Sequence, residues 1–264
     1  MRILITNDDG INAPGLAVLE DIAADVAGPD GEVWTVAPAN EQSGVGHCIS
    51  YTRPTMLSQL GDRRFALEGT PADCVMAGLH DIMADTPPDL LLSGVNRGNN
   101  SGENTLYSGT IGGAMEGALQ GVRSIALSQF YGPGNSSLNN TFEASAQYGA
   151  DVVRRLVEHG DWAPKAGYGT FYNVNFPPVA AADVKGVRAV AQGCREGVRF
   201  GTVRHESPSG RLFLWVRGGR QDVTTAPGTD VAANLNGYVS VTPMRADLTD
   251  HDQISALATA FETC

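Results

Sequence analysis

The chain has 264 residues, of which 42% are hydrophobic and 18% charged, a composition that supports one α/β domain with a substantial buried core. Its formal net charge is -11 and it has only two lysines, Lys165 and Lys185, which excludes the basic surface of a protein that binds duplex nucleic acid. No apolar run approaches the ~20 residues of a membrane span, the start shows no signal-peptide pattern, and the four cysteines include no C-x-x-C pair, so we expect a cytoplasmic protein with no membrane partner and no zinc site.

Apolar strand-like runs alternate with helical patterns through the first two-thirds of the chain. The predicted strands are Arg2–Thr6, Val33–Ala37, a run from Leu90–Leu92 that stops at Ser93-Gly94, and Ser124–Gln129. The predicted helices are Leu16–Val26, Ala72–His80, Thr110–Gln120 and Phe142–His159. This alternation is typical of a doubly wound, mostly parallel sheet with helices on its faces.

The last third of the chain has a different pattern. It predicts a glycine- and arginine-rich hairpin or arm at Gly193–His205, strands at Arg211–Arg217 and Tyr238–Thr242, and a terminal helix at Gln253–Phe261. We therefore predict a single α/β domain over 1–264, with a core at about 1–185 and an arm and C-terminal extension at about 186–264. An arm of this kind is expected to pack on a second subunit.

The loop after the first predicted strand carries two adjacent carboxylates, Asp8 and Asp9. In an open parallel sheet, ligands bind beyond the carboxyl ends of the strands. Adjacent carboxylates at such an end repel each other and resist burial, and a divalent cation such as Mg²⁺ or Mn²⁺ would remove both problems. The alternative interpretation is that Asp8 and Asp9 cap the following helix, with Gly10 making a turn.

Two further loops follow predicted strands and carry side chains that could bind a metal or a phosphate group. Ser43 follows the second strand and offers a hydroxyl oxygen, although taken alone it is more readily understood as an ordinary turn serine. Asn96 and Arg97 follow the Leu90–Leu92 run and offer a carbonyl oxygen and a planar fork of donors suited to phosphate. Their alternative is a polar surface loop in which Asn96 makes a left-handed turn.

Ser108, Gly109 and Thr110 lead into the predicted helix Thr110–Gln120. Backbone N–H groups at a helix N-terminus bind anions, and nearby hydroxyl groups add donors. Simple N-capping by Ser108 is the alternative, and it is compatible with a ligand. Because carboxylates and phosphate repel each other, the three loops and this helix start together predict a metal that bridges Asp8, Asp9 and a phosphate group. His47, close to Ser43, is a candidate proton donor to the leaving oxygen.

The order of these motifs resembles that of the SurE family, the survival-protein E 5'/3'-nucleotidases, over nearly the whole chain. The matching stretches are 5–10, 13–15, 69–73, 93–98, 106–110, 115–117, 173–177 and 237–243. One departure is Gly112-Gly113, which stands where the family more often has alanine residues.

The resemblance implies a Rossmann-like core and one divalent metal per subunit, held by Asp8, Asp9, Ser43 and Asn96. It further implies release of phosphate from nucleoside 5'- and 3'-monophosphates, a side activity on short polyphosphate, and a homodimer or homotetramer with exchanged C-terminal segments. Oxygen ligands suit Mg²⁺ and Mn²⁺, with Ca²⁺ as a third alternative. We assign Asp8 and Asn96 to catalysis. The residues expected to bind phosphate are Asn96, Arg97, Ser108, Gly109 and Thr110.

A second function class is a module that binds nucleotides at the same sheet edge without turnover. The adjacent carboxylates argue against it, because a plain anion site has no use for them. An aspartyl phosphatase of the haloacid-dehalogenase type needs two aspartates separated by one residue, which Asp8-Asp9-Gly10-Ile11 does not supply.

Overall fold

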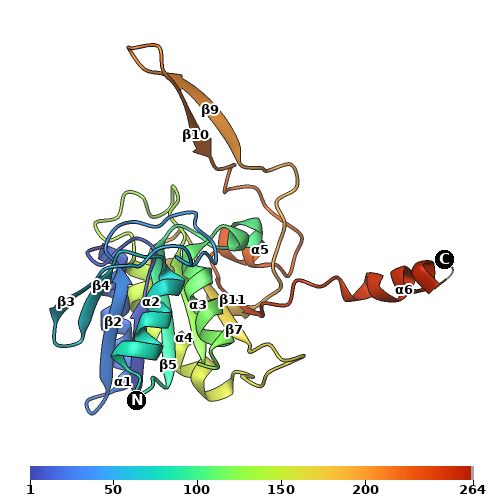
Figure 1. Ribbon diagram of the computed structural model, residues 1–264. Coiled ribbons are helices and arrows are strands. Elements are labelled where there is room, and N and C mark those ends of the chain that lie inside the picture. Colours follow the sequence, from blue (N-terminus) through green and yellow to red (C-terminus); the bar gives the residue numbers. More distant parts are fainter. Residues whose placement is uncertain (263–264) are drawn as a thin grey trace.

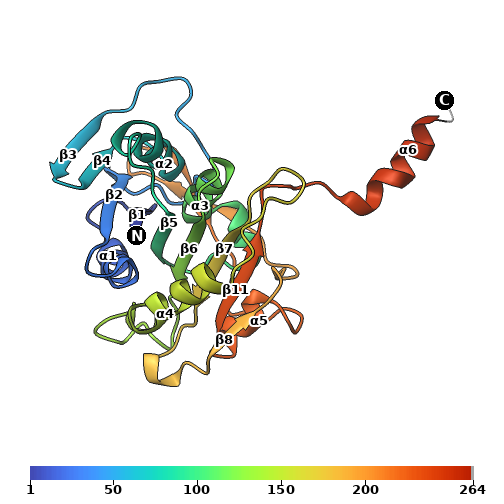
Figure 2. The ribbon, with the colours of Figure 1, turned by 90° about the horizontal axis from the view of Figure 1, so that it is seen from below.

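The computed structural model describes residues 1–262, and nine strands within them form one central sheet. The strand order across this sheet is β3-β4-β2-β1-β5-β6-β7-β11-β8 (Figure 2). The bounds are β1 Arg2–Thr6, β2 Glu32–Pro38, β3 Leu57–Gly61, β4 Arg64–Leu67, β5 Leu90–Arg97, β6 Ser124–Gln129, β7 Phe171–Phe176, β8 Val187–Ala189 and β11 Val239–Met244.

Helices cover both faces of the sheet, as predicted for a doubly wound α/β fold. One face carries α1 (Pro14–Ala27) and α4 (Glu143–His159), and the other carries α2 (Pro71–Ala77) and α3 (Gly109–Leu119) (Figure 2). A short helix, α5 (Asp230–Leu235), packs against β11 and β7. The short helices of other types are the π-helix η1 Gly78–Ile82 and the 3-10 helices η2 Gly102–Leu106, η3 Ala181–Asp183 and η4 His251–Gln253.

Most neighbouring strands run parallel. β1 pairs in parallel with β2 and β5, and the same direction continues through β6 and β7. The antiparallel pairs lie toward the two edges, where β3 meets β4 and β7 meets β11. The mostly parallel centre explains the continuous apolar runs, because strands covered on both faces need apolar side chains on both sides.

The core shows the two-residue period of a strand within β1. Ile3 and Ile5 are fully buried in the cluster formed with α1 and α4, whereas Leu4 is buried in the opposite cluster with α2. Successive strand side chains point to opposite faces, so one short run supplies both cores. The sheet thereby holds β1 rigidly, and with it the loop that follows.

Local sequence signals fix the helix starts. Pro14 opens α1, where its missing N–H would have no partner in any case. Thr70 caps α2 in a capping box, in which Asp73 N–H donates to Thr70 Oγ1 at 3.2 Å and Thr70 N–H donates to Asp73 Oδ2 at 2.8 Å. Ser108 caps α3 by accepting from Ile111 N–H at 3.0 Å.

The strand that begins at Leu90 is longer than predicted. It was expected to stop at Ser93-Gly94, but β5 continues to Arg97, with a shift of its pairing to β6 between Ser93 and Asn96. Polar residues at the end of a strand still pair their backbone groups when a neighbouring strand is available, here β6, and side-chain polarity does not reveal this. Asn96 therefore projects from an ordered strand end rather than from a free loop.

The chain after residue 185 contributes to the sheet as well as to an extension. β8 and β11 join the central sheet, whereas β9 (Gly201–Glu206) and β10 (Leu212–Arg217) form a separate antiparallel hairpin. Figure 1 shows this hairpin projecting from the body and α6 (Ile254–Glu262) standing away from it at the end of an extended segment. Within residues 1–262, no helix combines the length and apolar character needed to cross a membrane.

Candidate active site

Three loops and one helix start meet at a single edge of the sheet. β1 lies between β2 and β5, so the segments that follow these three strands are neighbours in space. From β1 the chain builds outward through β2 on one side and later through β5 and β6 on the other. The gap between β1 and β5 is thus the point where the strand order reverses, which is where ligands bind in open α/β sheets.

Asp8 is the buried centre of this edge. Its side chain is 3% exposed, and Thr110 Oγ1 donates to Asp8 Oδ1 at 2.6 Å. Burial raises the pKa of Asp8 to about 6; the Thr110 hydroxyl opposes this rise and the charge of Asp9 adds to it. Gly109 makes the arrangement possible, because a Cβ there would lie 2.9 Å from Asp8 Cβ.

Asp9 is oriented by the end of β5. Arg97 N–H donates to Asp9 Oδ2 at 3.0 Å, which ties the loop after β1 to the end of β5. Burial raises the pKa of Asp9 as well. The hydrogen bond and charge of Arg97 oppose this rise, and the charge of Glu41 adds to it. Asp9, Glu41 and Arg97 line a small cavity of about 180 Å³ beside the larger one that contains Asp8.

The capping alternative for the two aspartates does not hold. α1 begins five residues after Asp9, with Ala13 at the N-cap position and no side chain bonded to the free N–H groups. The turn is closed by Asn7 instead, whose side chain donates to Gly10 O at 2.9 Å and accepts from Gly10 N–H at 3.2 Å. Both carboxylates remain available for another purpose.

A cavity of about 450 Å³ brings most of the predicted site residues together. Asp8, Ser43, Asn96, Arg97 and Ser108 all line it. Gly109 and Thr110, both buried, are absent from its wall and act from behind Asp8. A volume of this size falls within the ~300–1,000 Å³ range of small-molecule sites.

The two neutral groups in this cavity have defined orientations. Asn96 Nδ2 donates to Gly98 O at 3.1 Å, which leaves its carbonyl oxygen Oδ1 as the free end of the amide. Ser43 is exposed and its hydroxyl donates to Glu41 Oε1 at 2.8 Å. An oxygen that donates its own proton keeps lone pairs for a cation.

The loop that carries Ser43 rests directly on α3. A Cβ on Gly112 would lie 2.4 Å from Gly46 O, so only glycine allows this contact. Gly46 N–H donates to Tyr107 O at 3.0 Å, and His47 Nε2 lies 2.6 Å from Glu116 Oε2. The bond from His47 holds the pKa of Glu116 below its usual range. His47, predicted as a candidate proton donor, fastens the loop to α3 and does not line the cavity.

One wall of the cavity comes from a part of the chain that sequence reasoning missed. Phe200, Gly218, Gly219 and Gln221 border the cavity from the two ends of the hairpin. Their place beside the third loop depends on pairings such as Asn99 Nδ2 to Gln221 Oε1, 3.1 Å across 122 positions. No local pattern in the sequence predicts a contact over that separation.

The buried Arg195 anchors this wall. It is 1% exposed, donates to Asn99 Oδ1 at 2.9 Å and to Ser101 O at 3.1 Å, and forms an ion pair with Glu103 at 3.1 Å. A buried guanidinium is stable only when such partners surround it. An arginine inside a glycine-rich arm was the one available signal that the arm returns to the core.

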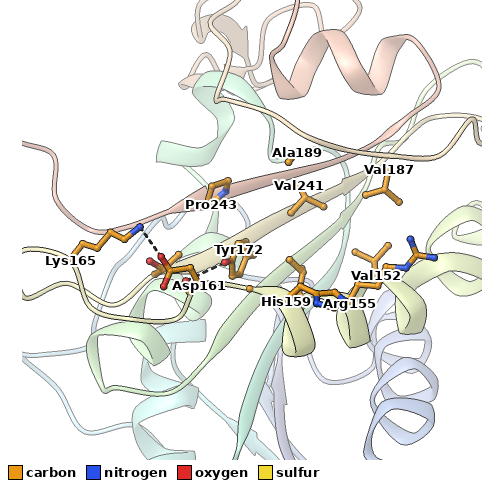
Figure 3. A pocket seen from close by; sticks show the side chains of 13 residues that line it. Val152, Arg155, His159, Asp161, Lys165, Tyr172, Val187, Ala189, Val241 and Pro243 are labelled. Atoms are coloured by element: carbon orange, nitrogen blue, oxygen red, sulfur yellow. Dashed lines mark hydrogen bonds and ion pairs between the residues drawn. The ribbon is translucent and has the colours of Figure 1, made fainter.

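A second cavity, of about 390 Å³, lies away from the aspartates between α4 and the β7–β11–β8 end of the sheet. Figure 3 shows Val152 and His159 of α4 facing Val187 and Val241 of β8 and β11. Charged side chains at its rim pair with each other; for example, Lys165 and Asp161 form an ion pair at 2.9 Å. The carboxylate edge, and not this apolar hollow, has the groups needed for chemistry on a phosphate.

The donor set at the carboxylate edge fits a hard divalent cation. Within the described chain, no three His, Cys, Asp or Glu side chains cluster as a metal site, so the two aspartates would need neutral oxygens such as those of Ser43 and Asn96. Mg²⁺ and Mn²⁺ accept such mixed oxygen ligands and retain waters. The raised pKa of Asp8 marks a carboxylate that a nearby cation would stabilise.

Comparison with known proteins identifies the family. Residues 3–198 match the family described as Survival protein SurE. The chain belongs to the SurE family. A protein named 5'-nucleotidase SurE from Roseobacter denitrificans is 68% identical over 258 residues, covering 98% of each chain. Another of that name from Jannaschia sp. is 66% identical over 263 residues, covering 99% of this chain and all of the relative.

The fold agrees with this assignment. The crystal structure of the SurE protein from Aquifex aeolicus superposes with a TM-score of 0.80 at 36% identity, covering 98% of this chain and 99% of that one. Coverage on this scale includes the hairpin and the extension after β11. The SurE fold thus extends over the whole chain, although the family match itself ends at residue 198.

Proposed function

We propose that the chain is a 5'-nucleotidase, a metal-dependent phosphomonoesterase that releases phosphate from nucleoside 5'-monophosphates and also from 3'-monophosphates. The observation that carries this proposal is the buried Asp8 in one cavity with Asn96, Ser43 and Ser108 at the start of α3, while its neighbour Asp9 lines the adjoining small cavity and is bonded to Arg97 N–H. The names of the relatives, each a 5'-nucleotidase, support the same reaction. Short polyphosphate is a further substrate in this proposal.

Asp8, Asp9, Ser43 and Asn96 would hold one divalent metal, with Mg²⁺ or Mn²⁺ as the physiological ion. When bound, the metal supplies charge neutralisation for the phosphate oxygens and a water of lowered pKa. Asp8 would accept the proton of the attacking water as the general base. The Thr110 hydroxyl, bonded to Oδ1, fixes the carboxylate for this role.

The phosphate group would lie against the start of α3. Ser108 lines the cavity and caps the helix, so the partial positive charge of the α3 N-terminus lies next to the cavity. The Asn96 amide and the Arg97 guanidinium extend this cradle from the end of β5. Preorganised donors of this kind supply much of the rate enhancement in enzymatic phosphoryl transfer.

The decisive experiment measures phosphate release from 5'-AMP, 3'-AMP and tripolyphosphate, first in EDTA and then with added Mg²⁺ or Mn²⁺. We expect turnover only with metal, and a fall of at least about 100-fold in kcat/KM for Asp9→Asn, because one charged ligand is lost. Asp30→Asn, an exposed aspartate in the turn before β2, is the matched control and should keep wild-type activity.

Two outcomes would contradict the proposal. Turnover that EDTA does not affect would remove the metal from the reaction. Tight binding of 5'-AMP without phosphate release under any metal would instead establish the non-catalytic nucleotide-binding module. Trapping of phosphate on Asp8 by rapid quenching would leave the activity intact but make Asp8 the nucleophile rather than the base.

We further propose that the protein is a homodimer or homotetramer that works in the cytoplasm. The hairpin side chains Leu214, Trp215 and Val216 are 65%, 67% and 74% exposed, an apolar surface that a second copy would cover. The cysteines Cys48, Cys74 and Cys194 are free thiols, as in a reducing compartment, and Cys264 lies outside the described residues.

A further inference from the structure

The lining of the cavity that contains Asp8 includes two chemically different sets of groups. One set is the carboxylate of Asp8, the Asn96 amide and the Ser108 hydroxyl, all suited to a metal and a phosphate group. The other set is the rings of Tyr107 and Phe200. A ligand that fills the cavity therefore meets both polar groups and an aromatic surface.

The two rings form a pair that is only partly satisfied within the protein. Their centroids lie 4.5 Å apart with planes tilted by 48°, and Tyr107 and Phe200 remain 46% and 40% exposed. Aromatic side chains gain free energy from stacking against a second flat ring system. Nothing in the described chain covers the remaining ring surface, because both residues border an open cavity.

The polar and aromatic groups are adjacent along the chain. Tyr107 directly precedes Ser108, the N-cap of α3, and its carbonyl oxygen accepts from Gly46 N–H at 3.0 Å. The backbone that carries the first ring is thus fixed next to the residue expected to bind phosphate. A small molecule that contacts both sets of groups must join a phosphate to a flat aromatic group by a short linker.

Phe200 is held in place by the anchored base of the hairpin. Gly218 packs on its ring, since a Cβ at Gly218 would lie 3.4 Å from Phe200 Cε1. Five residues earlier along the chain, Arg195 is fully buried among partners from the third loop. The ring therefore belongs to a built wall of the cavity and is not a side chain free in solvent.

Most amide groups near the rings are already hydrogen-bonded. Gln221 Oε1 accepts from Asn99 at 3.1 Å and from Asn104 at 2.7 Å, and Gln221 Nε2 donates to Gly219 O at 2.9 Å. The exception among the described residues of this wall is Asn104 Oδ1, which is buried and has no hydrogen-bond partner. Because these amide groups are paired or buried, the wall offers stacking rather than a set of hydrogen bonds that identifies one base. Preferences that rest on stacking are modest and follow the size of the ring system.

We propose that Tyr107 and Phe200 form the base subsite of the cavity, which stacks on the purine or pyrimidine of a nucleoside monophosphate. The subsite selects nucleotides over sugar phosphates that lack a base, and favours purines over pyrimidines without reading the base edge. This inference rests on the proposed phosphomonoesterase function of the same cavity and adds to it the residues that recognise the nucleoside.

The test compares kcat/KM for 5'-AMP, 5'-UMP and ribose 5-phosphate in wild type, Tyr107→Ala and Phe200→Ala. We expect the ratio of kcat/KM for 5'-AMP to that for ribose 5-phosphate to fall about tenfold in each alanine variant, mainly through KM for 5'-AMP. Tyr107→Phe and Phe200→Tyr keep a ring and should keep the wild-type ratio. Tyr131→Ala, an exposed aromatic outside both the cavity and the hairpin, is the matched control.

Equal losses on 5'-AMP and ribose 5-phosphate, or an unchanged ratio in both alanine variants, would overturn the subsite. Saturation-transfer NMR with adenosine separates this question from catalysis, because adenosine carries no phosphate. If wild type releases no phosphate from any substrate, the proposed function fails, whereas adenosine signals that weaken in Tyr107→Ala and Phe200→Ala still support the subsite. Adenosine signals that are the same in all variants would refute it.

Discussion

Asp8 lies in surroundings that oppose its own ionisation. Its pKa is raised from 3.8 to about 6 by burial, with the charge of Asp9 contributing. A carboxylate whose pKa is higher in the folded than in the unfolded chain weakens the fold when it ionises. Below pH 4 this penalty is absent, it grows between pH 4 and 6, and above pH 6 it reaches about 2–3 kcal/mol in the metal-free protein.

Asp8→Asn removes this penalty and keeps an oxygen to accept the Thr110 hydroxyl. We expect the metal-free variant to exceed wild type in unfolding free energy by about 2–3 kcal/mol at pH 8, and the difference nearly to disappear at pH 4. Urea denaturation in EDTA at the two pH values measures this. Asp30→Asn serves again as control, and a gain of equal size at pH 4 and pH 8 would contradict the electrostatic cause.

The site residues differ in how far sequence alone could reveal them. Asp8, Ser43 and Asn96 were predicted to meet because each follows a strand, and strand ends of a parallel sheet converge. Phe200 and Gln221 follow no such rule. They reach the cavity through the buried Arg195 and through side-chain pairs that only the folded chain brings together.

At the scale of elements, the contact of the Ser43 loop with α3 depends on the absence of a side chain at Gly112. Alanine at position 112 favours a helix by up to about 1 kcal/mol over glycine, yet its Cβ would lie 2.4 Å from Gly46 O. The loop would have to lift from the helix. The departure at Gly112 is therefore explained by a close approach of backbone, not by the helix that contains it.

Gly112→Ala should leave the overall unfolding free energy within about 1 kcal/mol of wild type. It should nevertheless raise the Mn²⁺ concentration needed for half-maximal activity by about tenfold, because Ser43 moves with the lifted loop. Titration of activity with Mn²⁺ tests this. Glu116→Gln, which weakens the bond to His47, should act in the same direction.

Leu119→Ala is the control for that titration. Leu119 is the last residue of α3, about two turns along the helix from Gly112, and its side chain is 44% exposed, so its loss alters the same helix away from the contact with Gly46 and should leave the Mn²⁺ requirement unchanged. An unchanged requirement in Gly112→Ala would show that Ser43 does not hold the metal or that the loop tolerates the extra carbon.

The strongly patterned elements were predicted within a few residues, and the weakly patterned ones were not. β1 and β6 agree with their predicted bounds, and α1, α3 and α4 differ by one or two residues at their ends. β3, β4, β7, β8 and α5 were missed. β8 has only three residues, and the alternating asparagines of β7 are fully buried, where each finds a hydrogen-bond partner that no local pattern announces.

At the scale of the whole molecule, the parts that extend from the body carry many of its exposed apolar side chains. Ile254, Leu257 and Phe261 of α6 are 50%, 55% and 76% exposed at helical spacing, and the strands of the hairpin are exposed throughout. A chain with net charge -11 gains solubility from its other surfaces. Apolar surface on projecting segments is typical of contacts between subunits.

Leu257→Glu combined with Phe261→Glu should shift the protein toward monomers, because charged groups on the apolar face of α6 cannot be buried unpaired. Size-exclusion chromatography with light scattering, over a tenfold range of protein concentration, gives the mass. Asp252→Asn, at an exposed position before α6, should behave as wild type. A wild-type mass of one chain at every concentration would refute the proposed oligomer.

Phe200 immediately precedes β9, so the wall of the cavity and the apolar hairpin are one continuous piece of chain. Any neighbour that immobilises the hairpin also restricts the ring, and any nucleotide that restricts the ring also immobilises the base of the hairpin. Assembly of the subunits and binding of the nucleotide are then linked equilibria, and such linkage is reciprocal. Substrate would tighten the assembly by the same factor by which assembly tightens substrate, so dilution alone would lower the apparent affinity for nucleotide.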